Sequence, residues 1–253
     1  LHLGNILLQW PSSLSSLTVQ QLYARFGGPE KEPVVRLDDQ AASAGPGVPS
    51  YAVHSVWIGT KSHELSLDDA KLILSDFGVA FRPADKARFE SYTPQVLRPP
   101  EAFFEPKKPL TFASDIWSLG CVIFELLAHR SLIDGFLAPQ DEITAQQVEL
   151  QGLMPDEWWA KWGKRSKWYD EAGHPLRNAS DMWSWERRLE QWIQHPRRRK
   201  GMDVISEEEV DALLSLLGQM LAWRPHERPR AREVLETDWM KEWALPAYRR
   251  ACK

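Results

Sequence analysis

The strongest hydrophobic pattern in the chain lies between residues 114 and 129. Apolar side chains occupy nearly every face of a helix drawn over this segment, which reads SDIWSLGCVIFELLAH. A surface helix carries a single apolar stripe, so this pattern predicts a helix that is buried on most sides. We therefore expect the segment to form the centre of the core.

A second helix is predicted after Ser206, which together with Glu209 has the spacing of a capping box. Pro225 and Pro229 then interrupt the helical pattern, which resumes over residues 231–243 and predicts a C-terminal helix that docks on the domain. The apolar stripe of the first of these helices consists of Val210, Leu213, Leu214, Leu217, Met220 and Leu221.

Two short apolar runs, at residues 3–9 and 71–75, have the length of strands. The residues between them are rich in Ser, Pro and Gly, so we interpret 10–69 as an insertion, with its clearest loop signal at 45–49. Within it, Thr18 is placed to cap a short helix that Gly27 and Gly28 would end. Strands are therefore few, and helices dominate the predicted fold.

Composition excludes several classes of protein. Hydrophobic residues make up 43% of the 253 residues and charged residues 26%, which is typical of a globular domain. The net charge of −4 gives no basic field that would favour direct nucleic-acid binding. No apolar run is long enough to span a membrane, so we expect no membrane partner. The two cysteines, Cys121 and Cys252, suit a reducing compartment better than a disulfide framework, so we expect a cytoplasmic or nuclear location.

A metal site is suggested by the residues that flank the two short strands. Asn5 lies at the first apolar run, and Asp76 follows the second and opens an Asp-Phe-Gly tripeptide. An amide oxygen and a carboxylate brought to one place suit Mg²⁺, which fills its remaining positions with water or phosphate oxygens. The tripeptide alone is a weak signal, because Asp-x-Gly is also ordinary turn chemistry.

The signal becomes specific because further motifs follow in order. Leu-x-x-x-Asn at 1–5, Asp-Phe-Gly at 76–78 and Pro-Pro-Glu at 99–101 together resemble the large C-terminal lobe of a eukaryotic protein kinase. The run from Ser114 to Gly120 resembles the start of that fold's central helix, and Arg228 resembles its late arginine. The resemblance implies a mostly α fold over residues 1–253, with short β-hairpins at the active face, and it implies ATP and Mg²⁺ as cofactors.

The resemblance also assigns roles to residues. It implies that Asp115 accepts hydrogen bonds from backbone N–H groups of the catalytic loop, and that Glu101 and Arg228 form a buried ion pair. The expected catalytic residues are His2, Asn5 and Asp76, the cofactor-binding residues Leu7, Ser75 and Asp76, the metal ligands Asn5 and Asp76, and the structural residues Arg98, Glu101, Asp115 and Arg228.

Arg98 and an insert at 135–205 narrow the resemblance to the group of protein kinases that includes the cyclin-dependent, MAP and SR-protein kinases. Residues 141–178 within that insert, and the earlier segment 22–58, are similar to fungal relatives of the SR-protein kinases, so a protein substrate rich in arginine and serine is implied. Acidic residues around the insert have two interpretations, a dock for arginine-rich peptides or a solvated helix face. They are Asp134, Asp141, Glu142, Glu149, Asp156 and Glu157.

Three departures from the family pattern set limits on these expectations. Leu1 takes the position just after the catalytic-loop aspartate, so the general base and the small lobe would precede this chain, which we expect to be an incomplete kinase that is inactive alone. His2 stands where the family usually has a lysine, and Thr93 is one residue further from Glu101 than the family's threonine.

Two other functions remain open on sequence grounds. The Leu-His-x-Gly-Asn loop is also similar to small-molecule kinases of the aminoglycoside and choline type, but these lack the Glu101 segment and its distant arginine. A pseudokinase-like binding module is the other alternative. Retention of both Asn5 and Asp76 favours an enzyme, because a scaffold has no chemical need for metal ligands.

Overall fold

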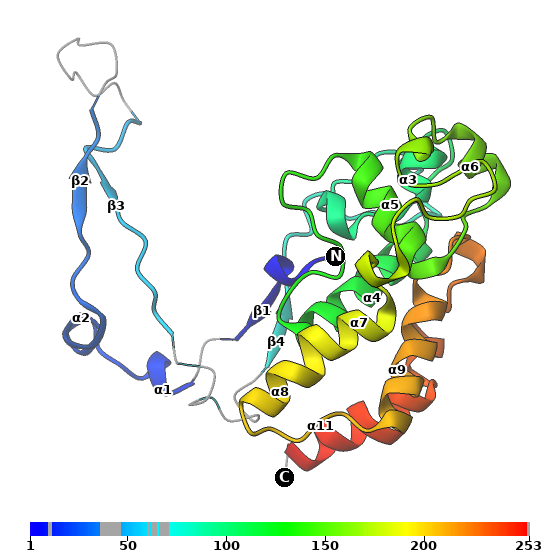
Figure 1. Cartoon of the computed structure of the whole chain (residues 1–253). Coiled ribbons are helices and arrows are strands. Elements are labelled where there is room, and N and C mark those ends of the chain that lie inside the picture. The colour runs from blue at the N-terminus through cyan, green and yellow to red at the C-terminus, as the bar shows by residue number, and fades with distance from the viewer. Residues whose placement is uncertain (10–11, 36–46, 60, 62–64, 66–70, 252–253) are drawn as a thin grey trace. The chain divides into compact units, whose positions relative to one another are not determined.

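A computed structural model of the chain (Figure 1) describes residues 1–9, 12–35, 47–59, 61, 65 and 71–251. The chain forms two compact units, one of residues 1–7 with 74–253 and one of residues 8–73. No helix among the described residues is both long and apolar enough to cross a membrane.

The larger unit is mostly helical, which confirms the predicted fold class. Shorter 3₁₀ and π turns connect or extend its helices, at Leu3–Asn5, Gln95–Leu97, Arg165–Lys167, Ala179–Asp181, Glu190–Gln194, Pro225–Glu227 and Trp239–Ala244. Its α-helices are α3 (Glu101–Phe104), α4 (Phe112–Ala128), α5 (Gln140–Gln151), α6 (Asp156–Lys161), α7 (Trp185–Leu189), α8 (His195–Arg199), α9 (Glu207–Met220), α10 (Ala231–Leu235) and α11 (Leu245–Ala251).

Helix α4 is the predicted central helix, and it is buried along most of its length. It begins two residues earlier than the sequence pattern indicates, because the Thr111 hydroxyl caps it by accepting a hydrogen bond from the Ala113 N–H. Gly120 lets α9 approach closely, since a Cβ there would lie 3.2 Å from the Met220 Cβ. Leu213 and Leu217 of α9 are fully buried in the resulting core.

Helix α9 starts as predicted, with the Ser206 hydroxyl accepting a hydrogen bond from the Glu209 N–H. The prediction of one C-terminal helix over 231–243 is wrong, because α10 ends at Leu235 and a π turn begins at Trp239. The Thr237 hydroxyl and N–H both donate to the Val234 carbonyl, which takes that carbonyl out of the regular helical ladder.

Tryptophan side chains anchor the segment that follows α5. Trp158 and Trp162 are almost completely buried, together with Phe104, Tyr169 and Trp223. The rings of Phe104 and Trp158 stack with centroids 5.5 Å apart, and the Trp158 Nε1–H donates to Glu105. The segment after α5 is therefore fixed against α3 through aromatic contacts.

The strands are short and form two-stranded sheets, with β1 (Ile6–Leu8) paired to β4 (Leu72–Leu74). The smaller unit contains α1 (Ser12–Ser15), α2 (Val19–Phe26) and an antiparallel hairpin of β2 (Lys31–Pro33) and β3 (Tyr51–Val53), in which Lys31 faces Val53. Thr18 caps α2 through a reciprocal box with Gln21, and the chain leaves the helix at Gly27, as predicted. Part of the predicted loop at 45–49 lies outside the described residues.

Cys121 provides a test of the packing around α4. Burial raises the pKa of its thiol from 9.0 to about 12. Between these two values the unfolded chain loses the thiol proton while the folded chain keeps it, so the free energy of unfolding falls as the pH rises from 9 to 12.

We expect the Cys121 contribution to this fall to reach up to about 1.4 kcal/mol per pH unit. Urea unfolding at pH 8 to 11 should therefore give a shallower pH slope for Cys121→Ala than for the natural chain. Burial also raises the pKa of Tyr169 to about 12. This residue is present in both proteins, so it contributes equally to both pH slopes. Equal slopes for the two proteins would contradict the buried position of the thiol.

Candidate active site

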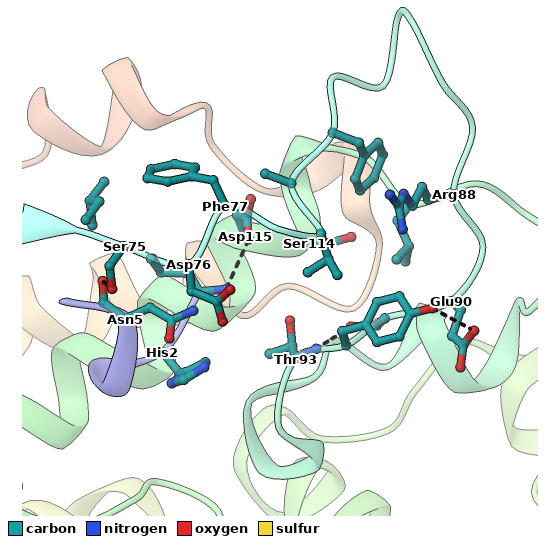
Figure 2. A pocket seen from close by; sticks show the side chains of 18 of the residues that line it. His2, Asn5, Ser75, Asp76, Phe77, Arg88, Glu90, Thr93, Ser114 and Asp115 are labelled. Carbon is teal, nitrogen blue, oxygen red and sulfur yellow. Dashed lines mark hydrogen bonds and ion pairs between the residues drawn. The ribbon is translucent and has the colours of Figure 1, made fainter. Parts of the chain in front are cut away.

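A pocket of about 500 Å³ lies at the end of the larger unit where β4 is followed by Asp76 (Figure 2). Its walls come from the first residues of the chain, from the segment 74–93 and from the start of α4. His2, Asn5, Ser75, Asp76 and Asp115 all line it. The structure thus gathers most of the predicted site residues in one place.

Asn5 and Asp76 are brought together by the backbone pairing that continues β1 and β4. The Ser75 N–H donates to the Asn5 carbonyl at 2.9 Å, and the Ser75 hydroxyl donates to the same oxygen at 3.3 Å. Figure 2 shows the Asn5 and Asp76 side chains next to one another on the pocket wall. Ser75 therefore lies within the site, where it holds the two predicted metal ligands in register.

Asp76 has an unusual backbone conformation, with φ of 59°. This left-handed region is uncommon for residues other than glycine, although Asp and Asn tolerate it better than most. Strained backbone of this kind persists where the surrounding structure fixes it, and it is concentrated at functional sites. The carboxylate of Asp76 is thereby presented to the pocket.

The donor set suits a magnesium ion that is shared with another ligand. Asn5 offers an amide oxygen and Asp76 a carboxylate, and both are the hard oxygen donors that Mg²⁺ prefers. Across the described part of the chain no group of three or more His, Cys, Asp or Glu side chains is arranged to hold a metal. Mg²⁺ at this site would thus take most of its ligands from water and phosphate oxygens.

Of the residues predicted to be catalytic, to bind the cofactor or to hold the metal, Leu7 is the one that does not line this pocket. It lies in β1 with about half of its side chain exposed, and the lining residues do not include it. Its neighbour Ile6 packs against the hydrophobic core. The assignment of Leu7 to the cofactor site stays a prediction.

Asp115 lies in the first turn of α4 and contacts the segment that resembles the catalytic loop. Its Oδ1 accepts a hydrogen bond from the Leu1 nitrogen at 3.3 Å. The side chain is 69% exposed and lines the pocket. Among the described residues, this hydrogen bond joins Asp115 to the loop. Further backbone donors from the loop stay a prediction.

Arg98 shapes the segment that borders the pocket. Its Nε and one terminal nitrogen both donate to the Thr93 carbonyl, at 3.2 and 3.0 Å. Thr93 lines the pocket, so this pair of bonds fixes the chain at the rim. Sequence reasoning identified Arg98 but not its partner, because a backbone carbonyl carries no sequence signal.

Glu101 and Arg228 form the predicted buried ion pair across 127 residues. The two guanidinium nitrogens lie 2.8 and 2.7 Å from the two carboxylate oxygens, which is bidentate geometry. Arg228 also donates to the carbonyls of Ala113, Ala222 and Trp223, and its guanidinium lies over the Trp117 ring. The arginine thereby ties α3 to α4 and to the segment that follows α9.

Arg88 is a pocket residue that sequence reasoning missed. It lines the pocket, its guanidinium lies 5.8 Å from the Phe81 ring centroid, and its buried Nε has no hydrogen-bond partner among the described residues. An isolated arginine in a polar segment has no distinguishing pattern, and only the fold shows that it borders the site.

The acidic residues around the late insert are largely engaged within the chain. Lys164 pairs with Asp141, Arg177 with Glu149 and Arg224 with Glu157. A hydrogen bond from its own backbone N–H, together with Arg224, holds the pKa of Glu157 below its usual value. These three carboxylates thus already have basic partners within the chain. The dock for arginine-rich peptides stays a prediction.

The fold and the pocket agree with those of a protein kinase domain. The protein kinase domain family matches residues 60–240, and the chain belongs to this family. It is similar to the serine/threonine-protein kinase SRPK of Physarum polycephalum, with 29% identity over 57% of this chain and 33% of the relative. It is 25% identical to cyclin-dependent kinase 11.2 of Caenorhabditis elegans over 75% of this chain and 27% of the relative.

A yeast protein kinase is also similar to this chain. The chain is 27% identical to the serine/threonine-protein kinase SKY1 of Saccharomyces cerevisiae, over 53% of this chain and 17% of the relative. The chain spans about a third or less of the length of these three curated relatives. These relatives therefore support a eukaryotic protein kinase as the class of this chain.

Proposed function

We propose that this chain is the large lobe of an ATP-dependent serine/threonine protein kinase. The observation that carries the proposal is the placement of Asn5 and Asp76 side by side in a pocket, held by the two hydrogen bonds between Ser75 and Asn5. Phosphoryl transfer depends mainly on positioning and on neutralising charge, and an amide with a carboxylate supplies both for a metal-bound nucleotide.

Each pocket residue has a part in this proposal. Mg²⁺ with ATP, when bound, would supply charge neutralisation on the transferred phosphoryl group. Asn5 and Asp76 would hold the metal, and Ser75 would keep them in register. His2, which lines the same pocket, would donate a hydrogen bond to the transferred group from a ring nitrogen.

We further propose that residues 1–253 alone do not transfer phosphate. The family pattern puts the general base immediately before Leu1, and the phosphate-gripping lysine and Gly-rich loop belong to the small lobe. In this proposal residues 10–69 are an insertion between the catalytic loop and Asp76, and residues 135–205 are a late insert. A cytoplasmic or nuclear location stays a prediction.

The protein substrate is proposed to be rich in arginine and serine, as the similarity to SRPK suggests. Exposed Glu142 and Asp156 are the acidic side chains of the insert best placed to meet such a peptide, because Asp141, Glu149 and Glu157 already have basic partners. Arginine should be preferred to lysine, since its planar guanidinium pairs with a carboxylate through two hydrogen bonds.

The acceptor of the phosphate distinguishes this proposal from its alternatives. The longest product of the encoding gene should be assayed with Mg²⁺ and radiolabelled ATP on three acceptors: an Arg-Ser peptide, the matched Lys-Ser peptide and an aminoglycoside. We expect labelled serine, at a higher rate on the Arg-Ser peptide. Labelling of the aminoglycoside alone would support a small-molecule kinase, and nucleotide binding without transfer would support a binding module.

A further inference from the structure

The loop that joins α4 to α5, drawn in green in Figure 1, holds two large apolar side chains in solvent. Phe136 is 85% exposed and Leu137 is 88% exposed, the two highest values among the large apolar side chains that the structure describes. Isolated exposed apolar residues are common on protein surfaces and need no explanation. Phe136 and Leu137 differ from such isolated residues, because they are adjacent and both are nearly fully exposed on a single turn.

This loop has a fixed shape. The Gln146 side chain accepts a hydrogen bond from the Asp134 N–H at 2.8 Å and donates one to the Asp134 carbonyl at 2.9 Å. The Asp134 carboxylate then accepts a hydrogen bond from the Phe136 N–H at 3.0 Å. Leu137 has φ of 55°, a left-handed conformation that is rare for such a residue. The two side chains are therefore presented by a braced and strained turn.

The turn packs against the segment that borders the active-site pocket. A Cβ on Gly135 would lie 2.2 Å from the Val96 Cγ1, so only glycine permits this approach. The Gln95 amide also donates to the Gln140 side-chain oxygen at 3.2 Å, which joins the same segment to α5. The position of Phe136 is thus fixed relative to Val96, three residues beyond the pocket residue Thr93.

The distance from the pocket to this turn is within reach of a bound peptide. An extended chain spans at most about 3.6 Å per residue, so Thr93 to Val96 covers no more than roughly 11 Å. The contact between Val96 and Gly135 and the step from Gly135 to Phe136 extend this path to roughly 20 Å. Phe136 therefore lies within about six extended residues of the pocket rim.

We propose that Phe136 and Leu137 form an apolar docking element for the polypeptide substrate. The element binds an apolar side chain that lies within about six residues of the phosphoacceptor. Its occupant is apolar because neither side chain offers a hydrogen-bonding group, so only removal of apolar surface from water favours binding. The occupant is the substrate because the element is continuous with the pocket rim through Gly135 and Val96. This inference rests on the proposed kinase function and adds a specificity determinant to it.

Peptides of thirteen residues with a central serine test the element on the longest gene product. Leucine is placed at each flanking position in turn, against a background of polar residues. We expect one or two leucine positions to lower KM by about tenfold with little change in kcat, as for a few methylene groups in an apolar contact. The double variant Phe136→Ser with Leu137→Ser should lose this preference while it phosphorylates the leucine-free peptide at the natural rate.

A matched control removes exposed apolar residues elsewhere on the same unit. Phe112 and Leu126, both on α4, are 66% and 57% exposed, and their replacement by serine should leave the leucine preference intact. Loss of the preference in this control, or its survival in the Phe136 and Leu137 variant, would overturn the proposal.

Two further measurements separate the possible failures. Fluorescence anisotropy of labelled peptides reports binding without turnover, so a leucine preference in binding with no phosphate transfer would support the element and reject the kinase function. Sedimentation at several concentrations reports self-association. Dimers that the Phe136 and Leu137 variant abolishes would show that a second copy covers these residues, which would overturn the proposal.

Discussion

Replacing Asp76 with asparagine is expected to lower kcat/KM for peptide phosphorylation by at least about 100-fold, the range found when one preorganised group that stabilises charge is removed. The variant loses the carboxylate of the proposed metal site, in which Asn5 and Asp76 are the two proposed protein ligands, and charge neutralisation is the main contribution to phosphoryl transfer. Asparagine tolerates the left-handed backbone at φ of 59°, so the fold should be kept. The measurement is radiolabelled phosphate transfer by the longest gene product with Mg²⁺.

The same segment of the chain supplies a control for this substitution. Asp85 is exposed, pairs with Arg82 and is not among the residues that line the pocket, so Asp85→Asn should retain the natural rate. An Asp76→Asn variant that keeps more than half of the natural kcat/KM and an unchanged melting temperature would show that this carboxylate has no part in the reaction.

Replacing Arg228 with alanine is expected to lower the free energy of unfolding by about 3 to 5 kcal/mol, the usual cost of breaking a buried ion pair. The carboxylate of Glu101 would stay buried without its bidentate partner, and three backbone carbonyls would lose a donor. For a unit of this size, this corresponds to a fall in melting temperature of roughly 6 to 20 °C. Urea unfolding and thermal melting of the 253-residue chain measure both quantities.

Two comparisons make this test specific for the buried pair. The double variant Glu101→Leu with Arg228→Met should regain much of the loss, because an apolar pair of similar volume leaves no buried charge uncompensated. Lys241→Ala breaks an exposed pair with Glu236 and should change stability very little. Equal effects of the Arg228 and Lys241 variants would contradict a structural role of the buried pair.

The elements that the sequence predicted well are those specified by local patterns. The nearly continuous apolar pattern of α4 and the capped amphipathic pattern of α9 each identify a helix from adjacent residues alone. The C-terminal helix was predicted as continuous because its apolar periodicity runs through Thr237. A hydrogen bond from the Thr237 side chain to a backbone carbonyl interrupts the helix without altering that periodicity.

The candidate site shows the same division between local and distant information. The motif order predicted that Asn5 and Asp76 meet, because two short strands deliver them to one edge. The sequence could not predict that Lys164 and Arg177 engage Asp141 and Glu149, since these pairs lie 23 and 28 residues apart and depend on how the insert folds. Arg88 was missed for the same reason, because its contact with the pocket arises only from tertiary structure.

The position of the metal is the most direct test of the proposed active site. Crystals of the longest gene product should be grown with Mn²⁺ as a substitute for Mg²⁺ and with a non-hydrolysable ATP analogue, and the anomalous difference density of manganese should be measured. The account predicts a peak at coordination distance from both the Asn5 amide oxygen and the Asp76 carboxylate, with the remaining ligands from phosphate and water. A manganese peak elsewhere, or nucleotide bound in the pocket without metal at these two residues, would contradict it.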